Sequence, residues 1–105
     1  MKEIFVVQVE AAPDGVQQSP DEFGGAYINV YTTELNIRNA IDIAEREVVD
    51  AGWRTERVVS AALNTADDFS DEDSGLQYYE QALLDGVVVV VHAFPPQHTE
   101  SDAFH

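Results

Sequence analysis

The residue best suited to acid–base chemistry is His92, because it is the only histidine inside a segment with a regular secondary-structure pattern. Histidine titrates near neutral pH and can act as a general acid or base opposite a hydroxyl or a carboxylate. Residue alternation along the predicted strands places His92 on one sheet face with Tyr27, Tyr31 and Glu56. A lone histidine on a strand is more often structural, so we expect no catalytic residue and favour a non-catalytic protein over an enzyme.

The residue types and their spacing give little indication of a metal or cofactor site. The chain has no cysteine, and His92, His98 and His105 lack the spacing of metal ligands. The acidic segment 67–73 resembles the start of an EF-hand loop, but Gly75 comes one position early and Ala82 stands where the ligating Glu belongs. We therefore expect no metal site and no cofactor.

The predicted site is thus a binding surface rather than a reaction centre. Tyr78 belongs to it because a half-exposed helical tyrosine suits a protein contact. The candidate binding residues are Tyr27, Asn29, Tyr31, Glu56, Tyr78 and His92.

Six elements must position these residues. Period-two alternation predicts strands over 3–11, 26–32 and 54–63, and the valine-rich run 87–94 predicts a strand buried on both faces, as in the centre of a sheet. Apolar residues at three- and four-residue steps predict a helix over 34–51, capped by Thr33 and ended by Gly52, and a second helix from Ser74 to Gly86. Residues 1–96 are expected to form a single domain, followed by a flexible polar tail, 97–105.

This order, ββαβαβ, predicts an α+β fold. We expect a two-layer sandwich of a four-stranded, mainly antiparallel sheet with both helices on one face, ferredoxin-like or a variant of it. Two helices would then leave one sheet face uncovered. That face is predicted to carry these residues: Ile4, Val6, Tyr27, Asn29, Tyr31, Glu56, Val58, Val88, Val90 and His92.

An exposed apolar face of this size needs a cover. One interpretation is a homodimer that pairs two such faces. Another is that the long loop from Pro13 to Gly24 folds over the face and forms a small pocket.

The charge of the chain limits its partners. Its 20 acidic and 5 basic residues give a net charge of −15. This charge excludes nucleic acid and anionic membranes as expected partners, because both are polyanions. It is compatible with a solvated acidic surface, with adaptation to high salt, or with binding to a basic protein.

These observations leave three candidate functions. The first is a small non-catalytic binding or regulatory domain, dimeric through its open sheet face. The second is an acidic, immunity-type inhibitor of a basic toxin or nuclease, and the third is a small-molecule binding protein or enzyme with a pocket on the sheet face. No signal peptide precedes the first strand and no apolar run could span a bilayer, so a cytoplasmic location is expected.

Overall fold

The computed structural model describes residues 2–69 and 74–96. The predicted tail (97–105, with His98 and His105) and most of the acidic segment around Asp71 lie outside the described residues. The elements, in chain order, are β1 (Ile4–Pro13), β2 (Gly25–Thr32), α1 (Ile37–Asp50), β3 (Trp53–Asn64), the 3-10 helix η1 (Ala66–Asp68), α2 (Ser74–Asp85) and β4 (Val87–Phe94). None of the helices within these residues is both long and apolar enough to cross a membrane.

The four strands form one antiparallel sheet in the order β3-β1-β2-β4. This confirms the α+β class and the four-stranded antiparallel sheet with two helices. The prediction of a central position for residues 87–94 is wrong, because β4 is an edge strand that pairs only with β2 among the described strands. Its valines face apolar side chains on both sides of the sheet, which produces the same pattern as a central strand.

The first sheet face is covered by α1. Val7 and Val9 of β1 and Ile28 of β2 are fully buried there against Ala44 and Val48 of α1. These helix positions lie four residues apart, so they form one stripe, as the sequence pattern predicts.

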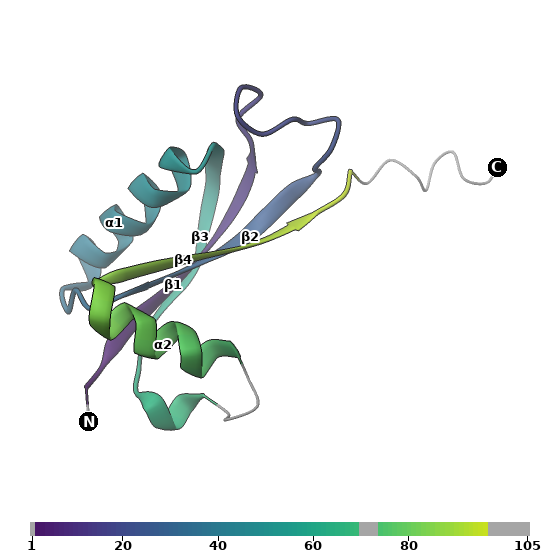
Figure 1. Ribbon diagram of the computed structural model, residues 1–105. Helices are drawn as coiled ribbons and strands as arrows, with labels where there is room; N and C mark the ends of the chain where they lie inside the picture. Colours follow the sequence, from purple (N-terminus) through teal and green to yellow (C-terminus); the bar gives the residue numbers. More distant parts are fainter. Residues whose placement is uncertain (1, 70–73, 97–105) are drawn as a thin grey trace.

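The second sheet face is covered at one end by α2, which corrects the expectation of both helices on one face. Ile4 and Tyr31 are buried against Tyr79 and Ala82 of α2, and Figure 1 shows the two helices on opposite sides of the sheet. The Tyr79 hydroxyl donates a hydrogen bond to the Lys2 carbonyl oxygen at 2.7 Å, which fixes α2 to the start of β1. The ferredoxin-like arrangement is therefore not confirmed.

Two irregularities in β3 change which of its residues face each helix. The register with β1 shifts between Gln8 and Val9 and again between Glu10 and Ala11. Each β-bulge adds one residue to β3 and reverses the alternation beyond it. Val58 consequently packs into the α1 core and not onto the second face, which is why its predicted position is wrong.

The long loop 14–24 folds toward the C-terminal end of α1 and not over the second face. Gln18 donates a side-chain hydrogen bond to the Ala51 carbonyl oxygen at 3.1 Å, and the Phe23 ring lies 5.6 Å from the Trp53 ring in a tilted contact. Gly52 ends the helix at φ +93°, and a Cβ added there would lie 2.6 Å from the Cβ of Gln17. The loop thus forms no pocket with the predicted site.

The start of α1 also differs from the prediction. Asn36, not Thr33, is the N-cap, and its side-chain oxygen accepts hydrogen bonds from the N–H groups of Arg38 and Asn39. Thr33 instead donates its N–H to the Gly86 carbonyl oxygen at 3.1 Å and extends the ladder between β2 and β4. The capping oxygen therefore lies three residues later in the chain than expected.

If α2 packs as described, Tyr79→Phe should lower the free energy of unfolding by about 1 kcal/mol, because it removes a part-buried hydrogen bond. The measurement is urea unfolding at neutral pH. Tyr27→Phe is the matched control, because Tyr27 is exposed, and it should change stability by less than about 0.5 kcal/mol. Equal effects at both positions would contradict the packing of α2 on this face.

Asp14 makes the loop sensitive to acid. The N–H groups of Val16, Gln18 and Gln17 donate to its carboxylate and hold the pKa of Asp14 below its ordinary value of 3.8. A depressed folded pKa stabilises the native state above pH 3.8, and this contribution is lost as the pH falls through the folded pKa.

Asp14→Asn should therefore have a lower urea midpoint than the wild type at pH 6, and the gap should shrink as the pH falls below 3.8 through the lowered pKa of Asp14. Urea titrations over this pH range measure the difference. Asp42→Asn on α1 controls for the loss of one negative charge in an acidic chain. A gap that persists undiminished at the lower pH would contradict the role of the carboxylate.

Candidate functional site

The part of the second sheet face that α2 leaves uncovered is polar. Strand register brings one row of four residues together across the sheet, since Glu10 lies opposite both Arg57 and Tyr27, and Tyr27 lies opposite His92. The next row toward α2 contains Gln8 and Asn29, which are also opposite each other. We call this surface the polar half-face, formed by Gln8, Glu10, Tyr27, Asn29, Arg57 and His92.

Tyr27 is the most prominent apolar surface within the polar half-face. Its side chain is 39% exposed, and its ring lies 5.9 Å from the ring of Phe94. Gly25 makes room for that neighbour, because a Cβ there would lie 2.8 Å from the Phe94 ring. The aromatic pair is therefore held against the backbone of two paired strands, which fixes Tyr27 at the surface.

An ion pair crosses the polar half-face next to Tyr27. The Arg57 Nε donates to a Glu10 carboxylate oxygen at 2.7 Å, with the arginine side chain 63% exposed. The arginine is largely solvated and Glu10 is partly exposed, at 32%, and a pair of this kind contributes little to stability. The pair holds the Arg57 guanidinium group against Glu10, the residue opposite Tyr27.

The structure brings together only part of the predicted site. Tyr27, Asn29 and His92 share the polar half-face, whereas Tyr31 is 6% exposed and lies beneath α2 in contact with the Tyr78 ring. The two tyrosines are thus packing residues of the second core. His92 lies opposite Tyr27 and not opposite Tyr31, whose row is four residues further along β2.

Glu56 does not lie in the row of Tyr27 and His92. It falls at the second bulge of β3, where it pairs with Arg54 at 3.1 Å and not with a residue of the central strands. The polar half-face instead contains three residues that the sequence analysis did not select, Gln8, Glu10 and Arg57. The polar residues Gln8 and Glu10 interrupt the apolar second face of the first strand, which was the sequence signal for an uncovered area.

His92 is the residue of the polar half-face that could act as an acid or base. Within residues 2–69 and 74–96, no three His, Asp or Glu side chains cluster as metal ligands would. His92 is exposed on an edge strand, and no contact of its side chain with a carboxylate is described. General acid–base chemistry needs a positioned partner and exclusion of water.

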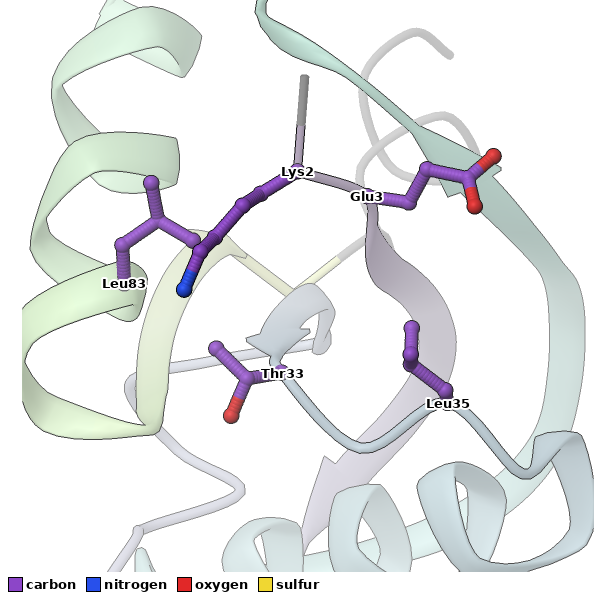
Figure 2. A pocket seen from close by; sticks show the side chains of 5 residues that line it. All are labelled: Lys2, Glu3, Thr33, Leu35 and Leu83. Atoms are coloured by element: carbon purple, nitrogen blue, oxygen red, sulfur yellow. The ribbon is translucent and has the colours of Figure 1, made fainter.

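A hollow of about 520 Å³ lies at the opposite end of the molecule, beside the start of β1. It is lined by Lys2, Glu3, Thr33, Leu35 and Leu83, and none of the predicted site residues is among them. In Figure 2 the Lys2 side chain extends toward Leu83, while the Glu3 carboxylate points away from it. A single ammonium group with no second polar group aimed at it gives this hollow no defined ligand chemistry.

No protein-family model, curated protein or solved structure matches the chain. Its function is therefore inferred from the surfaces described above.

The ion pair of the polar half-face should contribute little to folding. A double-mutant cycle with Glu10→Gln and Arg57→Gln should give a coupling free energy of about 0.2–1 kcal/mol at low salt, declining as KCl is added. Urea unfolding of the four proteins measures it. A salt-independent coupling well above this range would show that the two residues serve stability and not surface recognition.

Proposed function

We propose that this chain is a non-catalytic protein-binding domain whose contact surface is the polar half-face. The observation that carries the proposal is the exposed Tyr27 in the middle of the sheet, with His92 opposite it on the edge strand and Glu10, paired with Arg57, opposite it on β1. Tyrosine and arginine are enriched at protein interfaces, and they dominate binding energy when a partner desolvates them.

The shape of the surface supports a protein partner over a small molecule. The polar half-face lies on strands paired in a continuous sheet, whereas the hollow described above lies at the far end of β1. Small ligands are usually enclosed by concave sites, while protein partners bind flat surfaces with a central aromatic residue and polar groups around it.

The charge distribution narrows the class of partner. The polar half-face contains one carboxylate, on Glu10, and Arg57 compensates it at 2.7 Å. This area is therefore close to neutral on a chain of net charge −15. We expect a partner recognised by hydrogen bonds and aromatic contact, with the surrounding negative charge excluding acidic competitors.

The acidic inhibitor of a basic toxin or nuclease remains the second candidate. The feature that favours it is the net charge of −15. The two candidates differ in salt dependence, because a basic partner bound mainly through charge loses affinity steeply as the ionic strength rises.

Substitutions in the polar half-face should weaken partner binding. The wild-type chain would first capture its partner from its native cell lysate, and the partner would then be identified and purified. We expect Tyr27→Ala and Arg57→Ala each to raise the dissociation constant at least about tenfold by calorimetry. Arg38→Ala on α1, an exposed arginine outside the surface, is the matched control and should change it by less than about twofold.

Calorimetry at several KCl concentrations separates the two candidates. Retained affinity at high salt supports recognition by the polar half-face. Binding that disappears with salt and ignores both half-face substitutions would contradict the proposal and favour the acidic inhibitor.

A further inference from the structure

The outer edge of β4 is open. Its inner edge pairs with β2 from Val87 to Phe94, and this ladder continues through the Gly86 carbonyl oxygen, which accepts the Thr33 N–H. Across residues 2–69 and 74–96, no strand pairs with the other side of β4. An unpaired strand edge is a template for pairing with another chain.

The hydrogen bond between Thr33 and Gly86 shows which groups point outward. In an antiparallel ladder, hydrogen-bonded and non-hydrogen-bonded residues alternate. Residues 88, 90, 92 and 94 therefore direct their backbone groups toward β2. The residues with backbone N–H and C=O groups directed to the open edge are Val87, Val89, Val91 and Ala93.

The other edge of the sheet is built differently. β3 carries the charged residues Arg54, Glu56 and Arg57, and two bulges disturb its register. Charges and bulges are the features by which proteins prevent edge-to-edge pairing. β4 has neither, since its sequence VVVVVHAF contains no lysine, arginine or carboxylate and its pairing with β2 is regular.

We propose that β4 pairs antiparallel with β4 of a second copy of this chain, so that two sheets become one continuous sheet. Both edges then present the same alternation of donors and acceptors, which is self-complementary about a two-fold axis. The inference does not rest on the proposed function, because it uses the backbone edge of β4 and not the side chains of the polar half-face.

The side chains of β4 favour an uncharged apolar strand over a foreign basic one. The net charge of −15 repels a second copy at low salt, but β4 is the edge strand with no charged side chain apart from titratable His92, so pairing at this edge sets no like charges directly opposite each other. A cationic strand would find no carboxylate on β4 to bind. Val91 is 41% exposed, so pairing with a second valine strand would bury apolar surface that is now in water.

One register uses every outward backbone group. It centres the two-fold axis on Val90, places Val89 opposite Val91 of the second copy, and places Val87 opposite Ala93. The assembly is limited to a dimer because β4 provides one unprotected edge in each chain. The charges and bulges of β3 prevent pairing at the other edge.

The dimer would also change the polar half-face. In the same register Val88 lies opposite His92 of the second copy, and α2 packs over Val88. The α2 helix of each copy would therefore lie next to the polar half-face of the other copy and form a raised border along one side of it.

The test is sedimentation velocity across protein concentrations in about 0.5 M KCl, where screening reduces the repulsion between two acidic chains. We expect a concentration-dependent dimer for the wild type. Val91→Lys, a charge of the kind that protects natural edges, should raise the dimer dissociation constant at least about tenfold. Val49→Lys on α1 is the matched control, because Val49 is an exposed valine outside the edge, and it should leave the dimer intact.

Val91→Pro tests the backbone directly. Proline removes an N–H that points outward, so the ladder to β2 keeps its hydrogen bonds while pairing with a second copy is lost. Circular dichroism would show that each variant is folded. Hydrogen exchange should show the N–H groups of Val89 and Val91 protected in the wild-type dimer and unprotected in Val91→Lys.

Two results would overturn the inference. The first is that the wild-type protein remains monomeric at high salt at protein concentrations up to about 1 mM. This result would count against the dimer even if another protein were found to bind β4. The second is a dimer that both Val91 variants leave unchanged, because its interface would then lie elsewhere on the molecule.

Discussion

The packing of one end of the sheet between two helices is the constraint on which the rest of the structure depends. At this end β1 has apolar side chains on both faces, with Ile4 and Phe5 buried on opposite sides. Burial of both faces removes far more apolar surface from water than a two-layer arrangement of the same elements could. Each helix can supply only one apolar stripe, so α1 and α2 must separate to opposite faces.

The same constraint decides where the exposed surface is. Along β1 the second face changes from Ile4 and Val6 to Gln8 and Glu10, and α2 covers only the first pair. The uncovered end carries polar side chains and an exposed ion pair, which water can solvate. The apolar cover that the other end of this face requires is already part of the chain, because α2 supplies it.

Most of the local structure could be predicted from the sequence, since period-two and period-3.6 patterns are local signals. The strand over Val87–Phe94 and the helix ends at Gly52 and Gly86 are found where predicted. The candidate site was predicted only in part: Tyr27, Asn29 and His92 share a surface, while Tyr31 and Tyr78 are in a core. A tyrosine on a strand has the same sequence signature whether water or a helix covers it.

What the sequence by itself determined is the set of elements, their apolar stripes and a net charge of −15. Only the tertiary structure decided which helix covers which face, where β4 lies in the sheet, and which β3 residues join the site. The physical reason is that these choices depend on contacts between distant segments. The strand order determines which strand edge is unpaired, and the bulges at Glu56 and Val59 change which β3 side chains point to each face of the sheet. Neither feature produces a periodic pattern in the sequence.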